Sequence, residues 1–194
     1  MRILIISDTH GKLKRVYDVY NKLSKTSDID LIVHCGDYYD DAMDIHKHLG
    51  KKVVAVRGNC DRCFDENEFT ILETEAGNFF VCHGHMHNVK YNKQSIYYNA
   101  MQAGCTGAIF GHTHRAGKTE LGDFVFINPG SITKPRDSSG GTFALLDTAE
   151  GYINARIMNY QEFMDSEDTP PPPASKPKVK SGFLRRIINY SDGL

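Results

Sequence analysis

The sequence predicts an α/β fold in which two packed β-sheets of mixed strand direction carry helices on their outer sides. Apolar runs alternate with amphipathic helical segments in the first third of the chain, an order typical of parallel strands joined by crossover helices. In the second half, short strands follow one another across tight turns such as LGD and EAGN, as in hairpins. The 194 residues, 40% of them hydrophobic, suffice for one domain with a sizeable core.

The first third of the chain contains three expected strands and two expected helices. In chain order they are a strand over 2–7, a helix over 12–25, a strand over 31–35, a helix over 40–50 and a strand over 51–59. The first strand is an almost unbroken apolar run. The first helix places Val16, Val19 and Leu23 on one face, and the second has an acidic start and Gly50 as its stop signal.

Beyond residue 60 the pattern changes to short strands with a single helical segment. We expect strands over 69–73, 79–83, 107–110, 124–127 and 142–147, and a helix over 93–103. Both halves together indicate two sheets rather than one, because the strands are too many and too short for a single parallel sheet with a crossover helix after each strand.

The composition changes at Asp165. The predicted organisation is a domain over 1–164, a proline-rich linker over 165–182 and a short basic and apolar C-terminal segment over 183–194. Four consecutive prolines without apolar periodicity predict an extended, polyproline-like linker. The C-terminal tail has two interpretations: it contacts a partner or an anionic membrane surface, or it is a disordered tail that adds solubility.

The charge of the chain limits its partners. A formal net charge of −1 provides no global basic field, so we expect no stable nucleic-acid complex, and any anion must bind locally. No apolar run reaches the length of a signal peptide core or the roughly 18 residues of a transmembrane segment. We therefore expect a cytoplasmic protein with reduced cysteines. The sequence is compatible with a homo-oligomer.

Polar side chains of the kinds that bind metals follow several expected strands. They are Asp8, His10, Asp37, Asn59, His83, His112 and His114. Ligands in α/β sheets bind at the carboxyl ends of the strands, so a metal site explains this pattern economically. Oxygen and imidazole ligands without thiolate suit Mn, Fe or Zn. Seven ligands exceed the need of one ion with open substrate positions, so we expect two divalent ions that share a carboxylate, as in the hydrolysis of phosphate esters.

Five short motifs occur along the chain in a characteristic order. They are DTH at 8–10, GD at 36–37, GN at 58–59, HGH at 83–85 and GHTH at 111–114. Together they resemble the calcineurin-like metallophosphoesterases, and GNCD and NPGS are similar to the small bacterial and archaeal phosphodiesterase branch of that superfamily. The resemblance implies the metallo-dependent phosphatase fold, a four-layer α/β/β/α sandwich.

The resemblance also implies a role for each motif residue. The first ion is bound by Asp8, His10 and His114, the second by Asn59, His83 and His112, and Asp37 bridges both. Mn²⁺ is the expected metal, with Fe, Zn or Ni as alternatives. The implied reaction is hydrolysis of a small phosphodiester, with a nucleotide as one candidate, by attack of a metal-bridging hydroxide on phosphorus. The expected catalytic residues are Asp37, Asn59 and His85.

One position departs from the wider superfamily. Many members have a histidine directly after the motif asparagine, where it can protonate the leaving group, and this chain has Cys60. A thiol with an ordinary pKa of about 8.5 is a poor proton donor for that task, which favours diesters with reasonable leaving groups. Two alternatives stay open: a phosphomonoesterase or nuclease on the same site, and a non-catalytic protein-interaction scaffold.

Some of these polar residues also have purely structural interpretations. Asp8 and Asp37 could each cap a helix, and Asp61 could either hydrogen-bond within the site or close its own turn. His34 lies inside a strand, so we expect a hydrogen-bonded core histidine. We expect the NPGS turn to support the site. Arg136 either contacts substrate or lies on a flexible surface loop.

Overall fold

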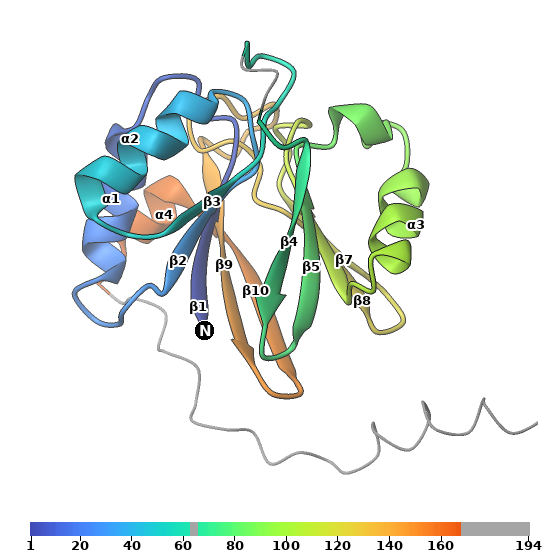
Figure 1. The fold of residues 1–194 in the computed structure, drawn as a ribbon. Helices are drawn as coiled ribbons and strands as arrows, with labels where there is room; N and C mark the ends of the chain where they lie inside the picture. The colour runs from blue at the N-terminus through green and yellow to red at the C-terminus, as the bar shows by residue number, and fades with distance from the viewer. Residues whose placement is uncertain (63–65, 168–194) are drawn as a thin grey trace, which may run out of the picture.

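Two mixed β-sheets pack face to face in this structure, a computed structural model that describes residues 1–62 and 66–167 (Figure 1). Among these residues the first sheet has five strands, in the spatial order β10 (Tyr152–Asn159), β9 (Thr142–Ala149), β1 (Arg2–Ile6), β2 (Leu31–His34) and β3 (Val53–Ala55). The described part of the second sheet runs β4 (Phe69–Thr74), β5 (Gly77–Cys82), β6 (Gly107–Phe110), β8 (Phe124–Asn128) and β7 (Gly117–Leu121). In the first sheet β1, β2 and β3 are parallel while β9 and β10 pair antiparallel, and in the second β5, β6 and β8 are parallel between antiparallel border strands β4 and β7, which confirms the predicted mixed direction.

Helices cover the outer face of each sheet, so the layers are helix, sheet, sheet and helix (Figure 1). The first sheet carries α1 (Lys14–Leu23), α2 (Tyr39–Leu49) and α4 (Tyr160–Asp165), and the second carries α3 (Gln94–Gln102). A single 3₁₀ turn, η1 (His85–His87), follows β5. Among the described residues, no helix has the length and apolar character needed to cross a membrane.

Strand β1 shows how the layers are held together. Ile3 and Ile5 pack into the core between the two sheets, whereas Leu4 and Ile6 pack against the helices on the outer side. All four side chains are fully buried. A strand buried on both faces needs apolar residues at every position, which is why its sequence shows no alternation.

The structure also contains elements that the sequence pattern did not predict. Of the strand expected over 51–59, only Val53–Ala55 forms a strand, β3. Asn59 therefore lies in the turn that follows it. Strand β7 was missed because all its residues are exposed and no apolar period marks it. Strand β10 and helix α4 were missed too, although Ile153, Ala155 and Ile157 do alternate with other residues. The predicted linker starts at the last residue of α4, and residues 168–194 lie outside the described part of the chain.

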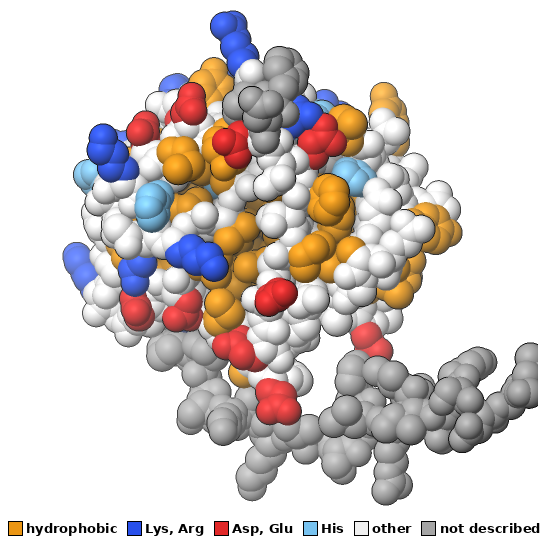
Figure 2. All heavy atoms as spheres, viewed as in Figure 1, with side chains coloured by type: hydrophobic (Ala, Val, Ile, Leu, Met, Phe, Trp, Pro, Cys, Tyr) orange, Lys and Arg blue, Asp and Glu red, His pale blue; other side chains and the backbone are white. Residues whose placement is uncertain are grey.

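Figure 2 shows hydrophobic side chains gathered across the middle of one face, in the region of the edge strands β3 and β4. Phe69 of β4 and Met43 of α2 are among the exposed large apolar residues, and the Phe69 ring stacks on Phe80 of the neighbouring strand. The stacking covers one side of the ring, so the side chain supports its own sheet even though half of its surface remains open.

A buried ion pair joins the neighbouring strands β1 and β9 of the first sheet at the end opposite the strand-end motifs. The Arg2 guanidinium donates from Nε to Asp147 Oδ1 at 2.7 Å and from Nη2 to Asp147 Oδ2 at 3.1 Å. Arg156 donates to the same carboxylate at 2.6 Å. Arg2 and Asp147 are almost completely buried and face each other across β1 and β9.

We expect Asp147→Ala to lower the free energy of unfolding by about 3–5 kcal/mol, because it leaves the buried Arg2 charge without its carboxylate. Urea denaturation of the purified variant would measure the change. Lys14→Ala is the matched control, since it removes an ion pair to Asp18 in which the lysine is exposed, and it should change stability hardly at all. Equal effects of the two substitutions would contradict the assigned role of the pair.

Candidate metal centre

All seven candidate ligands lie at the same end of the two sheets. Asp8 and His10 follow β1, Asp37 follows β2, and Asn59 lies in the turn after β3, so the first sheet supplies four of them. The second sheet supplies the rest from the segments after β5 and β6, namely His83, His112 and His114. The face-to-face packing of the sheets brings the two sets together, although their members are up to 106 residues apart in the chain.

The first group of ligand atoms belongs to Asp8, His10, Asp37 and His114, which each offer one atom within 4.8 Å of all the others. His114 Nε2 lies 3.1 Å from Asp8 Oδ1 and 3.4 Å from His10 Nε2. Asp8, Asp37 and His114 are buried, and His10 is half-buried. The group can therefore surround a cation while its outer side stays open to solvent through His10.

The second group is centred on His83. Its Nε2 atom lies 3.3 Å from Asp37 Oδ1, 3.2 Å from Asn59 Oδ1 and 3.2 Å from His112 Nδ1. Asp37 belongs to both groups, so the two share one carboxylate. The structure thus brings together all seven residues that the sequence marked as ligands.

Backbone carbonyls fix the orientation of two imidazole rings. His83 Nδ1 lies 2.7 Å from the carbonyl oxygen of Cys35, and His114 Nδ1 lies 2.6 Å from that of Lys134. A carbonyl oxygen only accepts, so each Nδ1 carries the proton. Nε2 of each ring then faces the cluster, the arrangement in which histidine binds metals.

The two carboxylate oxygens of Asp8 differ in the same way: one is held by hydrogen bonds and the other faces the cluster. Its Oδ2 accepts hydrogen bonds from the Ser7 hydroxyl at 2.6 Å and from the backbone of His112 at 3.2 Å. Its Oδ1 is buried, and no described group donates a well-oriented hydrogen bond to it, although His114 Nε2 lies 3.1 Å away. A buried carboxylate oxygen among nitrogen lone pairs is costly unless a cation lies there, so these residues fit a divalent metal.

The ionisation of the groups agrees with this interpretation. Burial lowers the pKa of His112 to about 4, and burial followed by the Lys134 charge lowers the pKa of His10, so both rings are neutral at pH 7. Burial acts to raise the pKa of Asp8, but its contact with His114 and the His83 charge outweigh burial and lower it. The Asp8 carboxylate is therefore ionised, and His10 and His112 keep their lone pairs, as metal binding requires. The hydrogen bond to Asp8 raises the pKa of His114, so a cation at this position would have to displace a proton from that ring.

The backbone at the ligands is unusual. Asp8, His10, Asp37, His112 and His114 have φ values between 50° and 67°, in the left-handed region. Residues other than glycine rarely adopt this region, and doing so costs roughly 1–3 kcal/mol each. The conformation turns the chain sharply at the end of each strand, which points the ligand side chain back over the rim. Strain concentrated on ligands is typical of functional sites.

Two motif glycines let the backbone approach the carboxylates. A Cβ at Gly58 would lie 2.3 Å from Asp37 Oδ1, and a Cβ at Gly111 would lie 1.9 Å from the Ser7 hydroxyl and 2.8 Å from Asp8 Oδ2. No side chain fits at either position. The glycines of the GN and GH motifs are thus part of the packing around the two acidic ligands.

A buried hydrogen-bond network supports the DTH turn from behind. Thr9 donates to Asp41 Oδ2 at 2.5 Å and lies 2.9 Å from His34 Nε2. The Gly11 backbone also donates to Asp41, at 2.8 Å. The prediction of His34 as a hydrogen-bonded core histidine is confirmed. Asp41 was missed, because in the sequence it is one of several acidic residues at a helix start.

The NPGS turn holds the same rim from the other side, as predicted. The Ser131 hydroxyl donates to the carbonyl oxygen of Asp8 at 2.8 Å. The Asn128 amide donates to the carbonyl oxygen of Gly111 and to the hydroxyl of Thr113, both at 3.0 Å. These bonds connect the segment after β1 to the segment after β6, which carry the ligands of the first group.

The structure decides between the interpretations left open for the acidic residues. Helices α1 and α2 have no side-chain cap at their N-terminal residues, so Asp8 and Asp37 are not helix caps. Asp61 instead accepts hydrogen bonds from the backbone of Tyr38 and Tyr39 at the start of α2, and from Gly58. It closes its own turn and joins it to α2, and so holds the loop that carries Asn59.

His85 lies beside the second group without belonging to it. Its ring centroid is 5.4 Å from that of His83 and 6.2 Å from that of His112. Its Nδ1 is buried, and no hydrogen-bond partner for that atom exists among the described residues. The side chain is half-buried at the rim of the second group, so it can meet a molecule bound there.

Comparison with known proteins agrees with this geometry. The model of the calcineurin-like phosphoesterase superfamily domain matches residues 1–151. The chain is 33% identical over 146 residues to the probable metallophosphoesterase YsnB of Bacillus subtilis, covering 75% of this chain and 83% of that protein. It is 30% identical over 149 residues to the phosphodiesterase MJ0936 of Methanocaldococcus jannaschii, covering 67% and 83%. The crystal structure of a predicted phosphoesterase from Streptococcus pneumoniae superposes with a TM-score of 0.69 at 24% identity, over 82% of this chain and 90% of that one.

We expect Gly58→Ala to weaken metal binding about 10- to 100-fold, because the added Cβ displaces the Asp37 carboxylate without changing any ligand. Metal content after dialysis against a series of buffered metal concentrations would measure the change. Gly117→Ala is the matched control, since a Cβ at that exposed position of β7 meets no atom within 4 Å. A Gly58 variant that keeps the affinity of the control would show that Asp37 does not bind metal.

Proposed function

Since the chain belongs to the calcineurin-like phosphoesterase superfamily, we propose that it is a phosphodiesterase that works with two divalent metal ions. The observation that carries the proposal is the position of Asp37. Its carboxylate contacts both ligand groups, within 3.3 Å of His83 Nε2 in one and within 4.8 Å of the ligand atoms of the other. A carboxylate shared between two sets of ligands is the arrangement of two-metal hydrolases.

Each set of residues would hold one ion. Asp8, His10 and His114 would hold the first, Asn59, His83 and His112 the second, and Asp37 both. Divalent cations supply Lewis acidity, which lowers the pKa of water and neutralises phosphoryl oxygens. The nitrogen and oxygen donors fit Mn²⁺, with Fe, Zn or Ni as alternatives. Burial raises the pKa of Cys35 far above its usual range, so no thiolate competes from this neighbour of the cluster.

The residues of the chain set the charge of the site. Asp8 and Asp37 are its only carboxylates among the seven ligands, and the other five are neutral at pH 7 as ligands. Two divalent ions with two carboxylates leave a net positive centre, which attracts a phosphodiester anion. His85 extends from the rim of the second group, where its imidazole can donate a hydrogen bond to a phosphoryl oxygen.

Cys60 is a poor candidate for the proton donor to the leaving group. Burial, together with the neighbouring Asp37, raises the pKa of this thiol to about 11. An acid so weak transfers its proton poorly at neutral pH. This supports substrates whose leaving group departs without strong protonation, and it argues against a dedicated phosphomonoesterase with alkyl substrates.

Two other functions are less well supported. A nuclease would need a long basic groove, and the chain has a formal net charge of −1. A scaffold without activity would not need a complete ligand set, and all seven ligand-type residues are present and gathered at one rim. The phosphodiesterase name of the Methanocaldococcus relative favours the diester among phosphoesters.

We expect Asp37→Ala to lower hydrolysis of bis(p-nitrophenyl) phosphate more than about a thousandfold, because both ions lose a shared ligand. Metal analysis of the same sample should show a fall from about two ions per chain to fewer than one. Asp44→Ala is the control, because Asp44 is an exposed residue of α2, the helix that follows Asp37. Wild-type turnover of the Asp37 variant would refute the bridging role, and wild-type protein with neither metal nor turnover would support the scaffold.

Cys60→Ala should change the turnover of the same diester by less than about threefold, because a thiol with so high a pKa is not the proton donor. Steady-state rates between pH 6 and 9 would test this. A large loss of turnover with unchanged metal content would show that the thiol takes part in catalysis.

A further inference from the structure

A cavity of about 350 Å³ lies next to the metal centre and is lined by Lys90, Thr113, Arg115 and Arg136. Thr113 separates the candidate ligands His112 and His114 in the chain, and Arg136 donates its backbone N–H to the carbonyl oxygen of His114 at 3.0 Å. The cavity and the metal ligands therefore share the same loop. We call it the cationic pocket.

The wall of the cationic pocket is held in place. The Thr113 hydroxyl donates to the carbonyl oxygen of Arg115 at 3.1 Å and accepts from the Arg115 backbone at 3.2 Å. It also accepts from the Asn128 amide at 3.0 Å. These bonds use the hydroxyl completely, so Thr113 shapes the loop while the three cationic side chains are the groups that can meet a ligand.

The charge of the cationic pocket is only partly offset within the described structure, where the Asp137 carboxylate interacts with Arg115. No carboxylate lines it, and among the described residues Lys90, Arg115 and Arg136 have no ion-pair partner. The acidic residue next to Arg136, Asp137, accepts a hydrogen bond from the Ser139 backbone. The chain as a whole carries a formal charge of −1, so this positive charge is a local feature.

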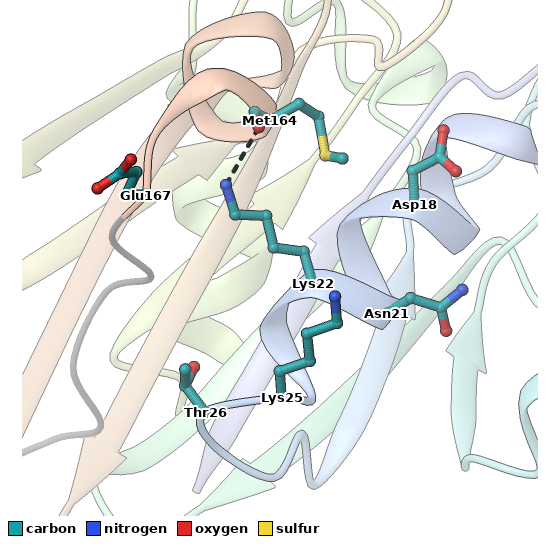
Figure 3. A pocket seen from close by; sticks show the side chains of 7 residues that line it. All are labelled: Asp18, Asn21, Lys22, Lys25, Thr26, Met164 and Glu167. Carbon is teal, nitrogen blue, oxygen red and sulfur yellow. Dashed lines mark hydrogen bonds between the residues drawn. The ribbon is translucent and has the colours of Figure 1, made fainter.

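A second cavity with cationic residues shows the contrast (Figure 3). That cavity is lined by Lys22 and Lys25 and also by two acidic residues, Asp18 and Glu167, so its formal charges balance. Lys22 donates to the backbone carbonyls of Phe163, Met164 and Ser166, so its charge supports the end of α4. That cavity therefore offers no net positive charge to a ligand.

We propose that the cationic pocket binds a second phosphate group of the substrate, in addition to the ester phosphate at the metal centre. The inference rests on the proposed function and narrows its substrate class to phosphodiesters that carry a further phosphate. Arginine guanidinium groups form paired hydrogen bonds with phosphate oxygens, and a lysine adds a point charge. The volume exceeds that of a phosphate alone and leaves room for part of the group that links it to the scissile ester.

The test compares two nucleotides that differ by one phosphate, thymidine 5′-monophosphate and thymidine 3′,5′-bisphosphate, by titration calorimetry on the metal-loaded full chain. We expect the bisphosphate to bind at least about tenfold more tightly. In the Arg115→Ala/Arg136→Ala double variant this ratio should fall below about threefold, and Lys90→Ala, from another loop, should lower it as well. Lys25→Ala, in the cavity of Figure 3, is the matched control and should keep the wild-type ratio.

Equal affinity of the two nucleotides for the wild-type protein would overturn the proposal, as would a preference that the double variant keeps. Inorganic phosphate that binds as tightly as the bisphosphate would assign the pocket to a free anion and overturn the assignment to substrate. The assay needs no turnover. A protein that prefers the bisphosphate but hydrolyses no diester would refute the proposed phosphodiesterase function and leave the cationic pocket in place.

Discussion

The rest of this structure depends on one electrostatic constraint: carboxylate, amide and imidazole atoms are held within hydrogen-bonding distance of one another at the rim of two sheets. His83 Nε2 faces the oxygens of Asp37 and Asn59, and Asp8 Oδ1 faces His114 Nε2, all within 3.3 Å. Acceptor atoms this close repel one another in a buried site unless a proton or a cation lies between them. The fold must hold them there, and the strained backbone at five of the ligands shows part of the cost.

The packing of the two sheets supplies what offsets that cost. The core between the sheets joins side chains of both, including Ile5 of β1 and Val81 of β5. This apolar burial is far larger than the strain of a few turns. The same packing sets the distance between ligands of the first sheet and ligands of the second, so the metal centre and the hydrophobic core depend on one arrangement. Hydrogen bonds then hold the individual turns: Asp41 accepts from Thr9 and Gly11, and the Ser131 hydroxyl donates to the carbonyl oxygen of Asp8.

The chemistry at the rim follows from which groups are charged. The ligands provide two carboxylates and five neutral donors, whereas the neighbouring cationic pocket provides Lys90, Arg115 and Arg136 without a carboxylate. An anion approaching the rim meets positive charge at both places. Because Cys60 is a weak acid, the leaving group has to depart without a proton from this thiol. These two features are the basis on which we propose multiply phosphorylated esters with a stable leaving group as substrates.

The sequence alone predicted which polar side chains gather at this rim, since each polar motif interrupts an apolar run at the end of a strand, and the order of the motifs is specific. It was also enough to predict β1, whose side chains are apolar because both faces are covered. It could not identify β7, which is exposed throughout, or the part that Asp41 and Asp61 play, because surface charge and buried support look alike in a sequence. The cationic pocket was out of reach for a related reason. Lys90 and Arg136 are 46 residues apart, and only the packing of the loops against the metal ligands brings their charges to one cavity.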